Sequence, residues 1–255
     1  MLMKKYLKYI LICLRSVIIF ILIGAILSAS VKNVMTSVKV SNFKAKGVYQ
    51  QDISTDNVKF YKIESNEELP SYIVKDNLII PGAPGDILVT KEALLGPSFV
   101  RAFITFFAGG HAALCTDSYT DLDFTLSDLK SIEATGLEEG ANLASSSYRT
   151  YWGSNDIYNE VIGLRVRTTE EQRQEVLSVA SSLIGDPYNY SFLFDTTNKS
   201  YCSDLVSKAY SYIGINLNKD DFTTSIYDLI VSGDTYISYY HYYDSNGTKN
   251  IYYLG

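Results

Sequence analysis

The stretch Tyr201-Cys202-Ser203-Asp204-Leu205-Val206 places a cysteine where a helix is predicted to begin. Apolar residues recur at helical spacing from Leu205 to Ile213, and Gly214 follows as the expected C-terminal cap. A thiol in the first turn of a helix ionises more easily, because the helix N-terminus favours negative charge. The stretch therefore predicts a central helix that presents a reactive cysteine at its start.

An imidazole beside such a thiol would complete the minimum equipment for nucleophilic acyl chemistry. The chain has only two histidines, and His111 begins the buried strand predicted over residues 111–115. Glu133, on the next predicted strand at residues 129–134, could fix the imidazole tautomer by accepting its other N–H. The second histidine, His241, lies among tyrosines and is best explained as part of an aromatic hairpin face.

Simpler explanations compete with this one. A cysteine on the apolar face of a helix is usually a packing residue, and a histidine after Gly109-Gly110 is typical of a turn. Most carboxylates such as Glu133 are merely solvated. Cys115 lies four residues beyond His111 on the same predicted strand, about 13 Å away at about 3.3 Å per residue, so it is expected in the core.

The N-terminus carries a separate signal. Lysines crowd residues 1–8, and residues 9–29 are apolar apart from Arg15 and a few serines. This pattern fits a membrane anchor, with Arg15 reaching back to the lysine-rich side, and it also fits a signal peptide cleaved at Ser28-Ala29-Ser30. A buried helix is the third explanation. Either export explanation leaves the lysines in the cytoplasm and the rest of the chain outside.

Composition excludes one broad class of function. The formal net charge of −6 and the pI near 5.0 argue against a nucleic-acid-binding protein, which needs a basic face. The motifs call for no cofactor and no metal. About 220 residues remain after the leader, enough for one domain with additions.

The rest of the pattern predicts an α+β fold, because strands and helices mix without regular alternation. Residues 31–57 are polar and aperiodic, which favours a juxtamembrane spacer or an irregular N-terminal arm, and residues 99–107 fit a helix or a strand equally well. Strands are expected at residues 58–63, 72–80, 85–90, 111–115, 129–134 and 160–166, helices at 170–183, 201–213 and 224–231, and a hairpin at 236–254 that turns at Asn246-Gly247.

Five motifs in order carry a family resemblance. They are Gly85-Asp86-Ile87, Gly110-His111-Ala112-Ala113-Leu114, Ile132-Glu133-Ala134, Ile184-Gly185-Asp186-Pro187-Tyr188-Asn189-Tyr190 and Tyr201-Cys202-Ser203-Asp204-Leu205-Val206. Together they resemble the circularly permuted NlpC-type papain-like hydrolases, the YiiX, YebB and YaeF-like group of amidases. The order His, polar residue, Cys distinguishes the permuted group. Departures are Ala112-Ala113 after the histidine and Asp204 where glutamate is common.

The resemblance implies an antiparallel half-barrel packed on helices and a role for each motif. Cys202 is expected as the nucleophile, His111 as the general base and Glu133 as the orienting residue, with Tyr190 and Tyr201 lining the substrate groove. The predicted organisation is an anchor or signal segment at residues 1–30, a spacer and N-terminal arm at 31–80, the catalytic domain at 81–233 and a tyrosine-rich hairpin at 234–255.

These expectations describe an exported or membrane-tethered cysteine hydrolase of the amidase or peptidase type. Peptides, including those of peptidoglycan, and lipid acyl groups are the expected substrate classes, and the membrane is the expected partner of the N-terminal segment. A decayed papain-like binding module and a lipid-directed acyltransferase remain alternatives.

Overall fold

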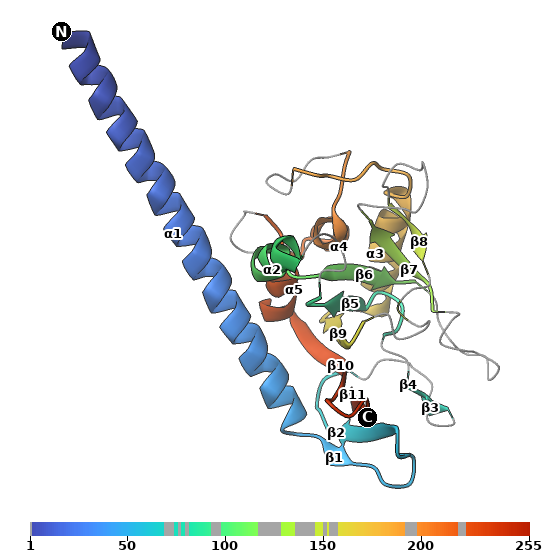
Figure 1. Ribbon diagram of the computed structural model, residues 1–255. Coiled ribbons are helices and arrows are strands. Elements are labelled where there is room, and N and C mark those ends of the chain that lie inside the picture. The colour runs from blue at the N-terminus through green and yellow to red at the C-terminus, as the bar shows by residue number, and fades with distance from the viewer. Residues whose placement is uncertain are drawn as a thin grey trace.

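The computed structural model of the chain describes residues 2–68, 74–75, 78–79, 82–92, 98–116, 129–135, 146–149, 152, 158–191, 198–218 and 223–255. One mixed domain lies beside a long N-terminal helix whose first half projects away from it (Figure 1). The α+β prediction is confirmed.

One sheet organises the domain, with strands in the order β1-β2-β11-β10-β9-β5-β6-β7-β8. All neighbouring strands are antiparallel except β2 and β11, which are parallel. A second, separate pair consists of β3 and β4. The strands are β1 (Val48–Tyr49), β2 (Val58–Ile63), β3 (Val74–Lys75), β4 (Leu78–Ile79), β5 (Ile87–Thr90), β6 (His111–Cys115), β7 (Ser131–Ala134), β8 (Ser146–Arg149), β9 (Glu160–Val166), β10 (Thr235–Tyr243) and β11 (Lys249–Leu254).

Helices α3, α4 and α5 pack apolar residues against this sheet and against one another. They are α1 (Leu2–Lys44), α2 (Ser98–Phe107), α3 (Glu170–Ser182), α4 (Cys202–Ser211) and α5 (Ile226–Val231). The main core joins Leu114 and Ile132 of the sheet to Leu205 and Val206 of α4. Helix α4 thus contacts β6 and β7, which places its first turn beside the start of β6.

The sheet continues across the predicted domain boundaries near residues 80 and 233. Strand β2 lies in the same sheet as β5 to β8, although residues 31–80 were expected to form a spacer and arm. The tyrosine-rich hairpin β10–β11 joins β9 to β2 through the middle of that sheet, so it is an integral part of the fold.

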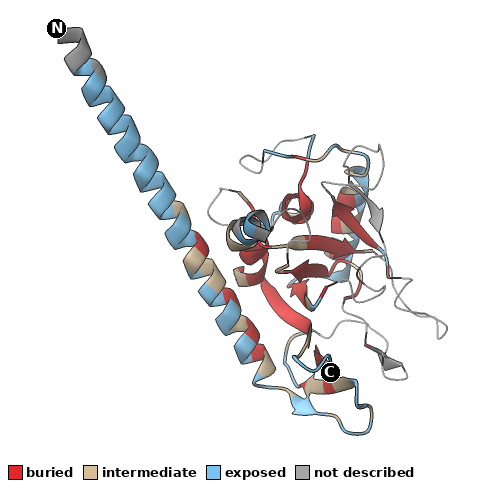
Figure 2. Ribbon diagram, viewed as in Figure 1, coloured by how far each residue is buried: buried red, intermediate tan, exposed pale blue. Residues whose placement is uncertain are grey.

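The prediction of an irregular spacer at residues 31–57 is wrong for its first part, since α1 runs unbroken to Lys44. The chain has no glycine or proline between Gly24 and Gly47 that would end the helix. Buried residues Ala29, Thr36 and Val40 face the domain at helical spacing, while apolar residues between them, among them Val34 and Val38, are exposed (Figure 2). Because exposed valines alternate with the buried residues, this half of α1 shows no apolar stripe at helical spacing in the sequence.

Two cationic contacts fasten this docked half of α1 to α5. Lys32 forms an ion pair of 2.6 Å with Asp228. The Nζ of Lys39 donates to the carbonyl oxygens of Ile230 at 2.5 Å and Thr235 at 3.0 Å, just where α5 ends and β10 begins. The second half of α1 and the domain therefore form one packed unit.

Two uncertain segments take definite forms. Residues 98–107, for which helix and strand were equally possible, form α2. The single strand expected at residues 72–80 is replaced, in its described part, by β3 and β4, which pair with each other. That pairing requires the chain to reverse between them, so one continuous strand is excluded.

We expect Lys39→Met to destabilise the protein by about 2 kcal/mol, because buried carbonyls at the end of α5 lose their donor. Thermal unfolding of the full chain in detergent measures this. The control is Lys46→Met, which changes an exposed lysine just beyond α1 and should leave the unfolding temperature almost unchanged. Equal effects would mean that the Lys39 contacts contribute nothing.

Candidate active site

Cys202 occupies the first position of α4, as the sequence predicts, and is 9% exposed. Its neighbour Tyr201 is the N-cap residue but makes no side-chain capping bond to the helix. The backbone N–H groups of the first turn are therefore not sequestered by a capping side chain, and that of Ser203 donates to the Cys202 sulfur.

His111 begins β6 beside this turn, because the preceding glycines allow a close approach. Gly109 has φ +82°, and a Cβ there would lie 1.9 Å from Ile226 of α5. A Cβ on Gly110 would lie 2.4 Å from the carbonyl oxygen of Glu92. Close packing therefore requires glycine at positions 109 and 110, and the same packing fixes the position of His111 at the start of β6.

Glu133 of β7 holds the imidazole from the other side. Its Oε2 lies 2.6 Å from the Nε2 of His111, and its side chain is fully buried. Because Glu133 occupies Nε2, the ring nitrogen left for the Cys202 sulfur is Nδ1, and His111 and Cys202 are hydrogen-bonded. The structure therefore brings Cys202, His111 and Glu133 together in that order.

The electrostatics favour an ion pair between thiol and imidazole. Burial opposes charge on both groups, yet their mutual hydrogen bond and the Glu133 carboxylate raise the pKa of His111 to about 10. The same bond to His111, with the backbone N–H groups of Ala112 and Ser203, holds the pKa of the Cys202 thiol below its ordinary value in spite of burial. A thiolate facing an imidazolium is the state this arrangement stabilises at neutral pH.

Two residues that support Glu133 were not foreseen. Its Oε1 accepts hydrogen bonds from the Ser131 hydroxyl at 2.5 Å and from the indole N–H of Trp152 at 2.7 Å. The Trp152 ring also stacks on the His111 ring, with centroids 5.7 Å apart and planes 8° from parallel. The sequence offered one signal for Trp152, since it is the chain's single tryptophan. For Ser131 the only signal was its position two residues before Glu133, on the same face of a strand.

The two tyrosines predicted to line the groove differ in their exposure. Tyr190 is 63% exposed and meets Tyr188 edge to face, so it can contact a substrate. The groove prediction for Tyr201 is wrong, since its side chain is 2% exposed and its hydroxyl accepts the backbone N–H of Thr224 at 2.8 Å. That bond ties Tyr201 into the core beneath the site.

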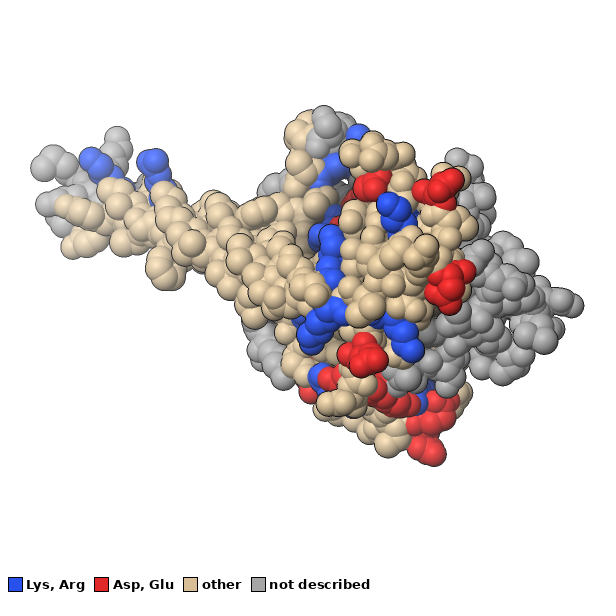
Figure 3. Space-filling view, turned by 90° about the horizontal axis from the view of Figure 1, so that it is seen from below, with Lys and Arg blue, Asp and Glu red and all other residues tan. Residues whose placement is uncertain are grey.

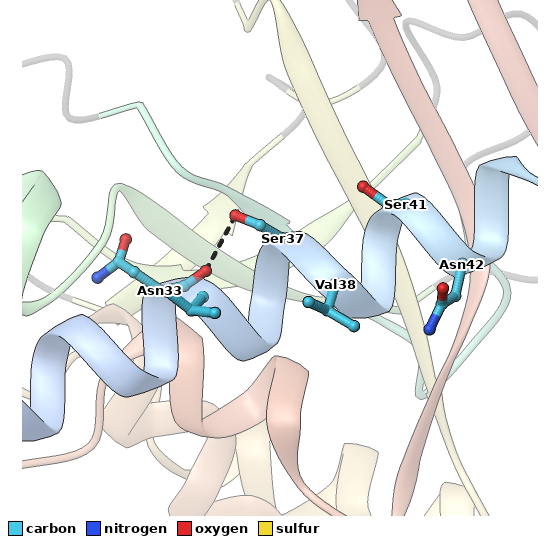
Figure 4. Close-up of a pocket in the computed structure, with 6 residues that line it drawn as sticks. Asn33, Ser37, Val38, Ser41 and Asn42 are labelled. Carbon is cyan, nitrogen blue, oxygen red and sulfur yellow. Dashed lines mark hydrogen bonds between the residues drawn. The ribbon is translucent and has the colours of Figure 1, made fainter.

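Other features lie outside this cluster. Cys115 is buried in a second small core with Leu88 and Leu129, as expected, and all three cysteines are free. A shallow hollow of about 380 Å³ follows α1, and the described residues that line it, from Asn33 to Asn42, carry no titratable side chain (Figure 4). Within the described part of the chain, no three His, Cys, Asp or Glu residues are grouped to hold a metal ion.

A family model matches the segment that carries the cysteine. The model is described as "Permuted papain-like amidase enzyme, YaeF/YiiX, C92 family", and it matches residues 150–231. This chain resembles the permuted papain-like amidases. The resemblance expected from the motifs is confirmed over that segment, which includes Cys202, Tyr190 and Tyr201, while His111 and Glu133 lie before it.

One solved structure is similar to the chain, described as the metalloprotein yiiX from Escherichia coli O157:H7. The identity is 16% and the TM-score 0.42, and the similarity covers 62% of this chain and 96% of that one. No curated protein matches the chain significantly.

We expect Ser131→Ala to destabilise the protein by about 1.5–3 kcal/mol, since a buried carboxylate loses a hydrogen-bond donor. Chemical unfolding measures the loss. Ser182→Ala is the matched control, because the Ser182 hydroxyl bonds only within its own helix at 2.6 Å and is exposed. If both variants unfold alike, Ser131 does not support the Glu133 carboxylate.

Proposed function

We propose that the protein is a cysteine hydrolase of the amidase or peptidase type, with Cys202 as nucleophile, His111 as general base and Glu133 as orienting residue. The observation that carries the proposal is the hydrogen-bonded series from the thiol at the start of α4 through both nitrogens of His111 to a fully buried carboxylate. The match to an amidase family over residues 150–231 supports the same class of reaction.

The geometry supports a two-step acyl transfer. The Cys202 thiolate adds to the carbonyl carbon of the substrate, and N–H groups at the open start of α4 stabilise the oxyanion. The imidazolium of His111 then protonates the leaving amine, and a thioester forms on Cys202. In the second step His111 takes a proton from water, the hydroxide attacks the thioester, and the acid leaves as Cys202 regains its thiolate.

Glu133 acts through His111 in both steps. Its carboxylate fixes the ring so that Nδ1 faces the sulfur, and it stabilises the charge that the ring carries before the leaving group is protonated. Because Ser131 and Trp152 satisfy Oε1, the carboxylate is held in one orientation without contact with water.

The decisive experiment compares the reactivity of Cys202 and Cys115 toward a thiol-directed electrophile, followed by mass spectrometry of the full chain. We expect Cys202 to react far faster at pH 7, with its rate sustained below the ordinary thiol pKa because His111 keeps the thiolate form. His111→Ala should lower the Cys202 rate at least about tenfold, since burial alone raises the pKa and one pKa unit changes the thiolate fraction about tenfold.

The dependence of the Cys202 labelling rate on pH should follow the directions of both pKa shifts. The thiolate–imidazolium pair is lost as pH falls through the lowered pKa of Cys202, and also as pH rises through about 10, where His111 loses its proton. Equal labelling of both cysteines, or a rate unaffected by His111→Ala, would mean a decayed binding module instead of an enzyme.

We further propose that α1 is a retained membrane anchor and that the domain lies outside the cytoplasm. The apolar helix is long enough to cross a membrane, and the lysines precede it, which favours their staying inside. The continuous helix through Ser28-Ala29-Ser30, with Ala29 packed on the domain, supports retention over cleavage. Peptide amides of the cell wall are the first substrate class to test, since an exported domain meets them.

Retention has a direct measurement. The intact mass of the protein from membranes should equal that of the full chain, and high salt should fail to extract it. A mass lower by the first 29 or 30 residues would show that the segment is a cleaved signal.

A further inference from the structure

The outer edge of the apolar part of α1 can be located along the helix. The stretch from residue 9 to residue 29 is about 31 Å long at about 1.5 Å per residue, which matches a hydrocarbon core of about 30 Å. Figure 3 shows, on the face that it presents, no charged side chain between the basic residues near the free end of α1 and the domain. The hydrocarbon edge therefore falls near Ala29, one turn before Lys32 and Asn33.

The domain starts to cover α1 at that same place. Every described residue from Tyr6 to Gly24 is exposed, Ala25 is half-buried, and Ala29 is 6% exposed (Figure 2). Parts of the domain that pack against residues 25–33 consequently lie at the boundary between lipid headgroups and hydrocarbon. No spacer separates them from a bilayer that α1 crosses.

Helix α2 is one of those parts. The side-chain amide of Asn33 donates to the carbonyl oxygen of Phe106 at 3.1 Å, at the end of α2. Tyr227 of α5 donates to the carbonyl oxygen of Thr105 at 2.5 Å and fixes the same turn from the domain side. In Figure 1, α2 lies beside α1 where the exposed half of α1 begins, and it crosses α1 instead of running along it.

The composition of α2 suits that boundary better than water. Its sequence, SFVRAFITFF, has no acidic residue and a single basic one, Arg101. Phe99, at the end of α2 away from the Asn33 contact, is 75% exposed, and Arg101 is exposed as well. An isolated exposed phenylalanine is unremarkable, but this one belongs to a helix whose last turn lies beside the membrane edge of the proposed anchor.

We propose that α2 lies in the surface of the bilayer that α1 crosses, with Phe99 in the upper hydrocarbon and Arg101 among the lipid phosphates. A short apolar helix with a basic residue is of the kind that lies in this interface. The partner of the exposed side of α2 is thus lipid, and the domain touches the membrane at a second place besides its anchor. This inference rests on the proposed membrane anchor and goes beyond the proposed acyl chemistry.

Contact with lipid at α2 would set the position of the site as well. Gly109 and Gly110 alone separate the turn after α2 from His111, and α5 contacts both α2 and α1. The two membrane contacts and the general base therefore belong to one rigid part of the structure, which gives the site a fixed height and orientation above the lipid.

The test adds a fluorescent probe to the full chain in nanodiscs that hold one copy each. Phe99→Trp is compared with the unmodified chain, whose single tryptophan, Trp152, is buried inside the domain and provides the background. Tyr49→Trp is the matched control, because Tyr49 is 47% exposed and lies in β1, beyond the far end of α1. Lipids brominated on their acyl chains quench only tryptophans that enter the bilayer.

We expect the emission added by Phe99→Trp to be blue-shifted and to be lost when the nanodiscs contain lipids brominated near the headgroup. The emission added by Tyr49→Trp should be unshifted and unaffected. Emission from position 99 that survives brominated lipids overturns the proposal. A blue shift that appears only at high protein concentration in detergent, without quenching in nanodiscs, also overturns it and assigns the surface to a second copy of the chain.

Discussion

The segment 224–226 holds Cys202 and His111 in contact, and the rest of the candidate site depends on it. The N–H of Thr224 bonds to the Tyr201 hydroxyl, and its carbonyl oxygen accepts the Ser203 hydroxyl at 2.8 Å. Two residues later, the N–H of Ile226 donates to the carbonyl oxygen of Ala108 at 3.1 Å, just before Gly109. One short stretch thereby joins the first turn of α4 to the turn that delivers His111.

The close approach at Gly109 explains why this link tolerates little change. Ile226 fills the space where a side chain on Gly109 would lie, so the turn before His111 and the start of α5 are packed as one surface. Asp228 reinforces it by closing a capping box with Ser225 while it also pairs with Lys32 of α1. Helix α1 is thus connected to the candidate site through a few buried polar contacts instead of through the sheet.

Local patterns in the sequence foretold the parts of the fold that depend on local physics. Strand β9 and helix α3 lie where the sequence predicts a strand and a helix, and Cys202 at a helix start was predicted from the apolar spacing behind it. The meeting of His111, Glu133 and Cys202 depends on three separate elements, so local patterns only suggested it, and the order of motifs in a resembling family strengthened the prediction. Roles for these residues remain proposals.

What the sequence could not show depends on contacts between distant segments. Tyr201 is an aromatic residue of the kind that lines substrate grooves, but its hydroxyl accepts a hydrogen bond from a backbone N–H more than twenty residues away. Trp152, 19 residues beyond Glu133, donates its indole N–H to that carboxylate. The residues after Ala29 were predicted as a spacer because nothing nearby in the sequence shows what their helix packs against. That surface is built by α5, near the other end of the chain.

The unbroken passage of α1 from its apolar half to its docked half has a consequence for how substrate is found. A flexible linker lets a tethered domain sample a volume that grows with linker length, whereas a helix packed along its last four turns permits almost none of that sampling. With α1 in a bilayer, Cys202 would search only a thin layer parallel to the membrane, in two dimensions, as the whole protein diffuses. Lateral density of substrate within that layer, and not its concentration in the surrounding volume, would then govern the rate of encounter.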